Sequence, residues 1–382
     1  MPVDVAGYLS EQQRKWESAG NQELAHEFAV LDELYNKKLW HQLTLCVGQL
    51  VKRPALAQGD SLVKLYHNFV ADFEQRINPL ALVEIVLVVT QHIRDPKEAL
   101  ELLEKIRERV KISDEASVLC MTAMGVIKLR ENDLDGTKAI IKQAQEVLDT
   151  LDGVTTVHGR FYDLSSNYYR QIGNHTDYYR DALRFLGCMD QAEIPQAQQA
   201  ERALNLCLAA ILGKDVYNFG ELLAHPILQA LAGGEKQWLV DLVFAFNSGN
   251  LGRFDQLRTH WQAQPDLAMH SVQMQQKISL LCLMEMTFKR PATDRQLTFT
   301  EIAAETHLPI DEVELLVMKA LSLGLVRGSI DEVERRVHMT WVQPRVLDRD
   351  QIATMRNKME QWYKDVIDME RLVEIKAQDI LT

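Results

Sequence analysis

The chain has 382 residues, enough for two or three domains and a substantial hydrophobic core. Its formal net charge is −12, so most of its surface repels a phosphate backbone, and nucleic acid is a poor first candidate for a partner. Residues 1–20 lack the apolar core of a signal peptide, and no apolar run approaches the ~20 residues of a membrane helix. We therefore expect a soluble intracellular protein with no membrane partner.

The five cysteines form no pattern that suggests chemistry. They are odd in number, widely spaced and without a CxxC pair, so neither a disulfide framework nor a zinc site is indicated. Each lies in an apolar helical pattern, which predicts a buried free thiol. The five are Cys46, Cys120, Cys188, Cys207 and Cys282.

Helical periodicity covers nearly everything from about Glu23 to Trp261. Asp95 before Pro96 predicts a helix start, because a carboxylate at the N-cap and a proline at the first helical position both favour one. Ser113 caps the next predicted helix, whose first turn is acidic, as the helix dipole prefers.

Turn signals interrupt these helices at intervals near 40 residues. Gly173, Gly213 and Gly249 are 40 and 36 residues apart, and Asn132 lies 42 residues before Asn174. We expect an apolar helix to resume within about five residues of each turn. Two helices per unit at this period predict a stacked, TPR-like solenoid, although the consensus residues of named repeats are missing. The alternative is that helical hairpins of similar size recur by chance.

The pattern changes after Pro265. A long apolar helix is predicted from about Ser271 to Phe288, followed by a short β-prone run and a helix that starts at the capping-box pair Thr298 and Glu301. A further helix is predicted from about 311 to 324, and two β-prone runs follow it, at 325–330 and 336–342. Helix, strand, helix, helix and β-hairpin is the order of a winged helix.

The last segment, from about 348 onward, is predicted to be one long helix. Its large apolar residues recur at spacings of three and four over about three heptads, which is typical of a seam that packs on partner helices. Lys376 interrupts the stripe and Ile380 resumes it. The alternative is that this helix folds back onto its own chain. The residues of the predicted protein-interaction seam are Ile352, Met355, Met359, Trp362, Val366, Met369 and Val373.

No catalytic motif is recognisable. The sequence lacks the P-loop, the dinucleotide fingerprint, GxSxG, and any HxH or HExxH pair of metal ligands. We therefore predict no catalytic residues, no cofactor and no metal, and hence a protein that is not an enzyme.

The predicted winged helix invites a nucleic-acid interpretation, which its charges disfavour. Its second helix opens with Asp311, Glu312 and Glu314, and Lys319 is its only cation. A recognition helix needs basic and amide side chains toward the bases and phosphates. We predict that this module binds protein instead, through a sheet edge that includes Val337, Met339 and Trp341. The alternative is a wing that faces solvent.

A helical stack followed by a winged helix and a terminal helix resembles the PCI domains, which are named for proteasome lid, signalosome and initiation-factor subunits. The sequence resembles, more narrowly, the PCI-domain lid subunits of the proteasome regulatory particle, from about residue 34 to the end. The stretches that carry the resemblance are KLWHQLTL (38–45), RFYDLSSNYY (160–169), DYYRDALRFLGC (177–188), QWLVDLVFAFNSGN (237–250) and VELLVMKALSLGLVRGSIDEVERRVHMTWVQPRVLD (313–348).

The resemblance implies a non-catalytic scaffold, in a hetero-oligomer with other PCI-domain lid subunits and the remaining regulatory particle, in the cytoplasm and nucleus. It implies association through winged helices and a bundle of C-terminal helices. The alternatives are a scaffold of the signalosome or the translation initiation factor, a nucleic-acid-binding winged-helix protein and, most distantly, an enzyme.

The fold class that follows is all-α: a TPR-like helical-repeat solenoid, a winged-helix (PCI) module with a small β-hairpin, and a long C-terminal helix. The expected domains are an N-terminal repeat domain at 1–176, a PCI domain at 177–344 and an assembly helix at 345–382. Within the PCI domain, the helical stack is expected to reach about residue 270 and the winged helix to span 271–344.

Overall fold

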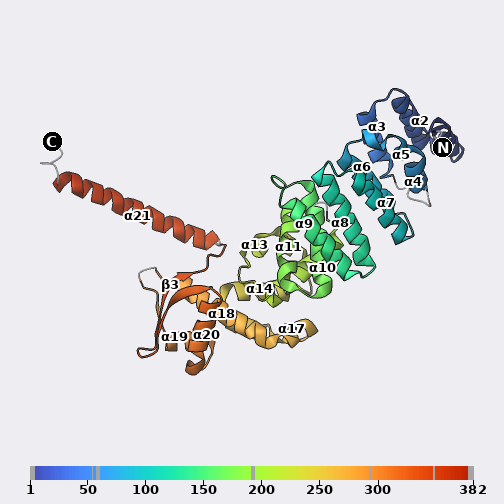
Figure 1. The fold of residues 1–382 in the computed structure, drawn as a ribbon. Coiled ribbons are helices and arrows are strands. Elements are labelled where there is room, and N and C mark those ends of the chain that lie inside the picture. The colour runs from blue at the N-terminus through green and yellow to red at the C-terminus, as the bar shows by residue number, and fades with distance from the viewer. Residues whose placement is uncertain are drawn as a thin grey trace. The chain divides into compact units, whose positions relative to one another are not determined.

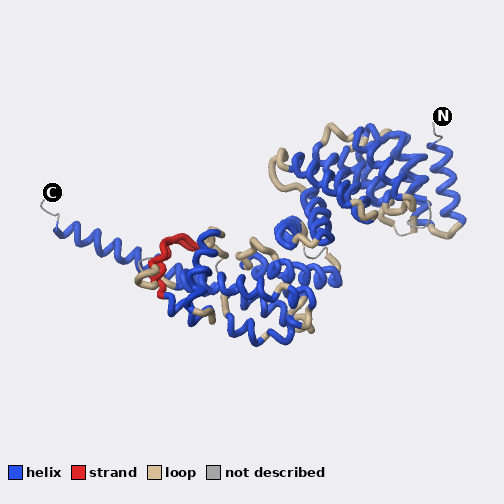
Figure 2. Tube along the Cα trace, turned by 60° about the horizontal axis from the view of Figure 1, so that its bottom comes forward, coloured by secondary structure: helices blue, strands red, loops and turns tan. Residues whose placement is uncertain are grey.

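A computed structural model of the chain describes residues 5–53, 55–56, 61–190, 194–291, 294–346 and 349–376. Helices make up most of it, and its strands are gathered in one small antiparallel sheet (Figures 1 and 2). This confirms the all-α class, with a helical stack, a winged helix and a long final helix. None of the described helices is long and apolar enough to cross a membrane.

The chain divides into two compact units, residues 1–190 and 191–382, and each is described by itself. Helix α11 packs on α10, so it belongs to the first unit. The domain limits at 176/177 and 344/345 that we expect from the sequence remain predictions.

The first unit is built from helical hairpins, of which α1 with α2, α8 with α9 and α10 with α11 have the most extensive contacts. Its helices are α1 (Val5–Ser18), α2 (Gln22–Asn36), α3 (Trp40–Leu50), α4 (Ser61–Leu65), the π-helix η1 (Tyr66–Val70), α5 (Ala71–Phe73), the 3-10 helix η2 (Glu74–Arg76), α6 (Pro79–Thr90), α7 (Pro96–Arg109), α8 (Asp114–Arg130), α9 (Leu134–Leu148), α10 (Thr156–Ile172) and α11 (His175–Cys188).

The two predicted helix starts are confirmed at atomic detail. The Asp95 carboxylate accepts a hydrogen bond of 3.0 Å from the Lys97 backbone N–H, and Pro96 is the first residue of α7. The Ser113 hydroxyl accepts from the Ala116 N–H at the start of α8. Each cap satisfies a backbone donor that would otherwise lack a partner.

Three of the four predicted turns join the two helices of a hairpin. Gly173 and Gly249 end α10 and α14 with positive φ angles of 78° and 62°, which glycine adopts without strain. Asn132 takes the same conformation before α9, at φ 65°. The fourth turn is different, because the chain after Gly213 does not resume a long helix within five residues. Helix α13 begins only at Gly220 and has five residues.

The second unit contains the remaining elements. They are α12 (Gln196–Leu212), α13 (Gly220–Ala224), the 3-10 helix η4 (Pro226–Ala230), α14 (Gln237–Ser248), α15 (Leu251–Gln256), α16 (Arg258–Gln262), α17 (Pro265–Met269), α18 (Ser271–Lys289), β1 (Gln296–Thr298), α19 (Phe299–Thr306), α20 (Ile310–Ser322), β2 (Val326–Asp331), β3 (Arg336–Val342) and α21 (Arg349–Lys376).

The winged helix has the predicted order of elements, from α18 through β1, α19 and α20 to the hairpin of β2 and β3. The capping box that starts α19 is present: the Thr298 hydroxyl accepts from the Glu301 N–H at 3.2 Å, and the Glu301 carboxylate accepts from the Thr298 N–H at 2.9 Å. The strand order is β1-β3-β2, and both pairings are antiparallel. Helix α20 buries an apolar stripe, made of Val313, Leu316, Val317 and Ala320.

Candidate functional site: surfaces for protein partners

Helix α21 carries a stripe of large apolar side chains that the described residues do not cover. The seven predicted seam residues are all exposed, with exposed fractions from 47% at Val366 to 68% at Trp362. Tyr363 lies eleven residues after Ile352, which is three helical turns, so it widens the same face. Soluble proteins seldom expose a contiguous apolar surface of this length unless a partner covers it. Ile380, where the stripe was expected to resume, lies outside the described residues.

The chain just before α21 is held against the helical stack. Arg345 donates hydrogen bonds to the Asn247 carbonyl oxygen in the last turn of α14, at 3.1 Å, and to the Glu285 carboxylate of α18, at 2.5 Å. Both charged side chains of this ion pair are nearly buried. A Cβ on Gly220 would overlap the Val346 side chain, so a glycine is required there for this close approach. Arg345 and Val346 therefore anchor the segment that leads to α21.

The predicted edge of the sheet needs correction. Strand β3, which carries Val337, Met339 and Trp341, is the central strand, with β1 on one side and β2 on the other. Val337 and Met339 are buried in the core of the winged helix, and Trp341 is half-buried with the Arg327 guanidinium over its ring. The prediction was wrong about the edge because β1, only three residues long, was not expected to pair with β3.

The long edge of the sheet belongs instead to β2, which pairs only with β3 among the described residues. The Met339 N–H donates to the Arg295 carbonyl oxygen, so the backbone groups of Met339 face the β1 side. Backbone groups alternate in direction along a strand, and therefore those of His338 face β2, where Ser329 is the paired residue. By the same alternation, the backbone N–H and C=O of Ile330 point away from the sheet.

The exposed face of α20 is not basic. Asp311 and Glu312 are exposed at its first turn, and Lys319 is exposed two turns later. Leu315 and Met318 lie between them and are 64% and 51% exposed. A phosphate backbone would meet two carboxylates and two apolar side chains here, which does not favour nucleic acid.

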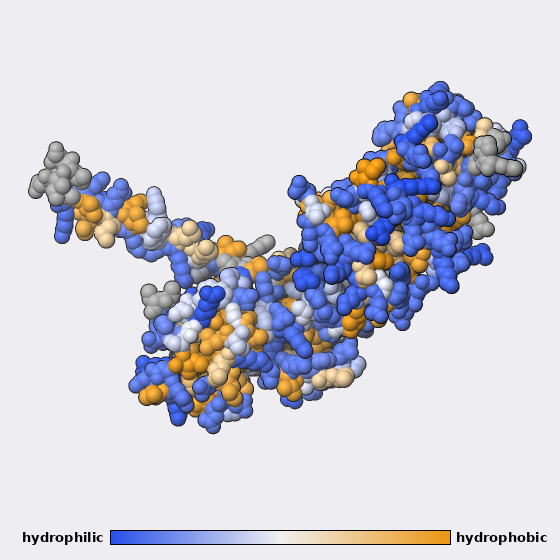
Figure 3. Space-filling view, viewed as in Figure 1, coloured by the Kyte–Doolittle hydropathy of each residue, from blue (hydrophilic) through white to orange (hydrophobic). Residues whose placement is uncertain are grey.

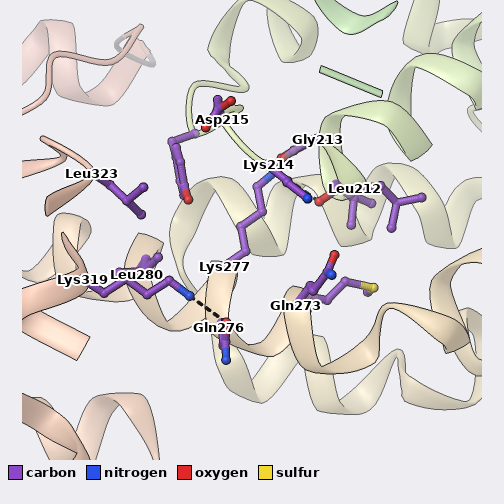
Figure 4. A pocket seen from close by; sticks show the side chains of 13 residues that line it. Leu212, Gly213, Lys214, Asp215, Gln273, Gln276, Lys277, Leu280, Lys319 and Leu323 are labelled. Atoms are coloured by element: carbon purple, nitrogen blue, oxygen red, sulfur yellow. Dashed lines mark hydrogen bonds between the residues drawn. The ribbon is translucent and has the colours of Figure 1, made fainter. Parts of the chain in front are cut away.

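A cavity of about 370 Å³ lies within the second unit, between the end of α12, α18 and the end of α20 (Figure 4). At its floor, Lys277 of α18 is buried, and its ammonium donates hydrogen bonds to three backbone carbonyl oxygens at the C-terminal end of α12. The acceptors and distances are Ala210 (2.7 Å), Ile211 (3.1 Å) and Gly213 (2.7 Å). Burial lowers the pKa of Lys277 to about 7, and the attraction of Asp215 acts in the opposite direction.

Sequence reasoning missed both Lys277 and Arg345. A lysine between the apolar positions of α18 was a possible signal for the first, because a charge on a buried face needs a partner. Nothing in the sequence pattern singled out Arg345.

The described residues offer no recognisable reaction chemistry. No three His, Cys, Asp or Glu side chains within them lie together in a way that could hold a metal ion. All five cysteines are free, but Cys46 and Cys188 are only partly buried, which corrects the expectation for these two. Burial raises the pKa of Cys120 and of Cys207 to about 12, so these thiols stay protonated and are poor nucleophiles at neutral pH.

Two family models match the chain, and they follow its architecture. The model described as PSD13 N-terminal repeats matches residues 27–243, and the model of the PCI domain matches residues 254–341. The 26S proteasome non-ATPase regulatory subunit 13 of Dictyostelium discoideum is 35% identical over 94% of this chain and 95% of its own length. The chain belongs to the family of 26S proteasome non-ATPase regulatory subunit 13. Homolog B of the same subunit in Arabidopsis thaliana is 36% identical over 94% of this chain.

Membership of the subunit 13 family confirms the resemblance to PCI-domain subunits. The relatives and the matched families indicate no enzyme family. Eukaryotic translation initiation factor 3 subunit M of Drosophila persimilis is also similar, but at 25% identity and over 44% of this chain and 41% of its own length. The subunit 13 family therefore accounts for far more of the chain.

Proposed function

We propose that this chain is a non-catalytic scaffold subunit of the 26S proteasome regulatory particle, in its lid, next to other PCI-domain subunits. In this role it contributes to lid assembly and so to the ATP-dependent degradation of ubiquitinated proteins by the whole complex. Membership of the subunit 13 family supports a place in the proteasome regulatory complex. The protein is then intracellular, in cytoplasm and nucleus.

The observation that carries the proposal is the exposed apolar stripe of α21. Burial of a large apolar side chain is worth about 1.5–3 kcal/mol before entropic costs. Seven such residues on one face can therefore offset the cost of holding a long helix against its neighbours. The stripe also includes Tyr363, and it is broader than the seam of a two-stranded coiled coil. A bundle of several helices fits a face of this width.

Truncation after Val346 tests this role of α21. We expect the truncated protein to keep its melting temperature and to lose only the helical circular dichroism of α21 itself, because Arg345 and the winged helix remain. It should fail to enter the regulatory particle on native gels. If α21 instead covers its own chain, truncation lowers the melting temperature and exposes dye-binding surface. Normal incorporation of the truncated chain would rule out α21 as the assembly element.

The second candidate is a scaffold of another PCI assembly, either the signalosome or the initiation factor. The partial similarity to initiation factor 3 subunit M favours the latter as the alternative. Purification of the tagged native protein separates the candidates. Co-purification with proteasomal ATPases supports the regulatory particle, whereas recovery of initiation-factor subunits without ATPases supports the alternative.

The winged helix provides a second proposed contact, through the edge strand β2. The outward backbone groups of Ile330 can pair with a strand of a neighbouring subunit, as in other sheets extended by a partner. Val337 and Met339 then act indirectly, because their side chains hold the sheet on the helices behind it.

A further inference from the structure

The cavity beside Lys277 has the size and lining of a binding pocket. Its volume, about 370 Å³, is near the lower limit of the roughly 300–1,000 Å³ of ligand pockets, so it fits one or two side chains. Apolar side chains such as Leu280 and Leu323 contribute to its wall, and polar groups stand around them. Figure 4 shows these side chains around one shared space.

Three lysines and one aspartate line this cavity, which leaves a local excess of positive charge in a chain of net charge −12. Lys214 is exposed and has no ion-pair partner in the part of the chain that the structure describes. Lys319 donates a 2.7 Å hydrogen bond to the neutral amide of Gln276, and so its charge is not neutralised (Figure 4). Asp215 is the carboxylate of the set. Lys214 and Lys319 are both exposed, so they are available to a carboxylate from outside.

The side chain of Lys277, which lines the cavity, is held in one position. Its ammonium is held by the three carbonyl oxygens of α12 and lies near the rings of Tyr217 and Phe219, at 5.7 and 5.3 Å from their centroids. These contacts occupy its donors, so Lys277 makes no hydrogen bond to a ligand. Lys214 and Lys319 are left to make the hydrogen bonds.

Apolar surface continues from the cavity along α20. Leu315 lies four residues before Lys319, so the two side chains are neighbours on one helical face. Met318 belongs to the same face, and Leu323 joins it to the cavity wall. Figure 3 shows apolar side chains gathered over this part of the winged helix.

We propose that this cavity is a docking site for an acidic peptide segment of a partner protein. One Asp or Glu side chain of the segment enters between Lys214 and Lys319, and a neighbouring apolar side chain lies on Leu315 and Met318. The site is separate from the stripe of α21 and does not depend on which PCI assembly the chain joins.

The same surface does not suit nucleic acid. Asp215 inside the cavity, with Asp311 and Glu312 at the start of α20, would repel successive phosphates. The aromatic side chain that lines the cavity is Tyr217, whose ring lies over the Lys277 ammonium and is not free to stack on a base. A peptide with a single carboxylate beside an apolar side chain meets no succession of repulsions and needs no aromatic ring to stack on.

The test uses the purified full chain and two fluorescent peptides of otherwise neutral residues, one with a single glutamate beside a leucine and the other with glutamine in place of that glutamate. We expect the glutamate peptide to bind about tenfold more tightly, with an affinity that falls as salt is raised. The double variant Lys214→Gln/Lys319→Gln should lose this advantage. Its matched control is Lys138→Gln/Lys142→Gln, which removes the same charge from exposed positions of α9 and should bind as the unaltered chain does.

Equal binding of both peptides, or an unchanged glutamate advantage in the Lys214/Lys319 variant, would overturn the proposal. So would the absence of binding by either peptide at millimolar concentration. Binding of a single-stranded oligonucleotide that is lost in the same variant, without preference for the glutamate peptide, would assign the site to nucleic acid instead. Circular dichroism of each variant establishes that the fold is intact before binding is compared.

Discussion

Lys277 places an ammonium group inside the contact between α12 and α18, where three carbonyl oxygens at a helix C-terminus accept its hydrogen bonds. The last carbonyls of a helix have no partners within the helix, and the negative end of its dipole attracts a cation. Lys277 therefore acts as a cap that comes from another element of the fold. The cap joins the helical stack to the first helix of the winged helix.

Replacement of Lys277 by methionine tests the value of this cap. Lys277→Met keeps most of the side-chain volume but leaves buried carbonyls without donors, so we expect the free energy of unfolding to fall by about 2–4 kcal/mol. Urea unfolding followed by tryptophan fluorescence measures the change. Lys214→Met, on an exposed lysine close by, is the control and should change stability by less than ~0.5 kcal/mol. Equal stability of Lys277→Met and the unaltered chain would contradict the capping role.

The titration of Lys277 predicts how this stability difference varies with pH. Burial lowers its pKa to about 7, whereas in the unfolded chain the side chain keeps its proton up to the ordinary lysine pKa of 10.5. Between these values the unfolded state binds more protons, so the unaltered chain gains stability over Lys277→Met as pH rises from 7 to 9, by up to about 1.4 kcal/mol per unit. Unfolding curves at several pH values test the sign. Lys214, Asp215 and Lys319 are present in both proteins, so their contributions to the pH dependence of stability largely cancel in the difference.

Local sequence predicted the residues whose partners are near in the chain, and missed those whose partners are far away. The caps of Asp95 and Ser113 bond within three residues, and both were predictable. Lys277 contacts carbonyls more than 60 residues earlier, and Arg345 contacts one 98 residues earlier. Such contacts depend on how the helices stack, which a single sequence does not reveal.

At the scale of elements, α21 offers the clearest candidate for a single residue that anchors a helix to its partner. Trp362 is the largest side chain of the exposed stripe, and loss of a packed aromatic anchor costs about 2–4 kcal/mol. We expect Trp362→Ala to weaken incorporation into the regulatory particle on native gels without changing the melting temperature of the free subunit. Lys364→Ala, on the opposite side of the helix, is the matched control. Equal incorporation of both variants would show that Trp362 is not the anchor.

The edge strand β2 allows a paired test. Proline removes a backbone donor, and the N–H of Ile330 points away from the sheet, so Ile330→Pro should leave the ladder with β3 intact. We expect it to weaken association with a neighbouring subunit in pull-downs more than Ile330→Ala does, because alanine removes the side chain but keeps the N–H. If the proline and alanine variants associate equally well, the outward edge is not the contact.

The elements themselves were largely predictable, and the pairing of the strands was not. Periodicity, caps and turn residues located α18, α19, α20, β2 and β3 to within a few residues. The burial of Val337 and Met339 follows from the alternation of β3, but alternation does not tell a central strand from an edge strand. That distinction depended on β1, which is too short to give a pattern of its own.

At the scale of the whole molecule, a scaffold should be chemically silent. The sequence contains no P-loop motif, and the described side chains provide no cluster of metal ligands. Isothermal titration of the purified chain with ATP and with zinc should therefore give no saturable heat. Stoichiometric binding of either at micromolar affinity would contradict the scaffold function.

The anchorage at Arg345 decides how mechanical load passes through the second unit. After α18, the chain forms the rest of the winged helix, from β1 to β3, and then returns to α14 and α18 through Arg345 before α21 begins. Tension on α21 is thus transferred at Arg345 directly to those two helices. The part of the winged helix from β1 to β3 lies outside this route, so a neighbouring subunit can strain it while α21 remains attached to α14 and α18.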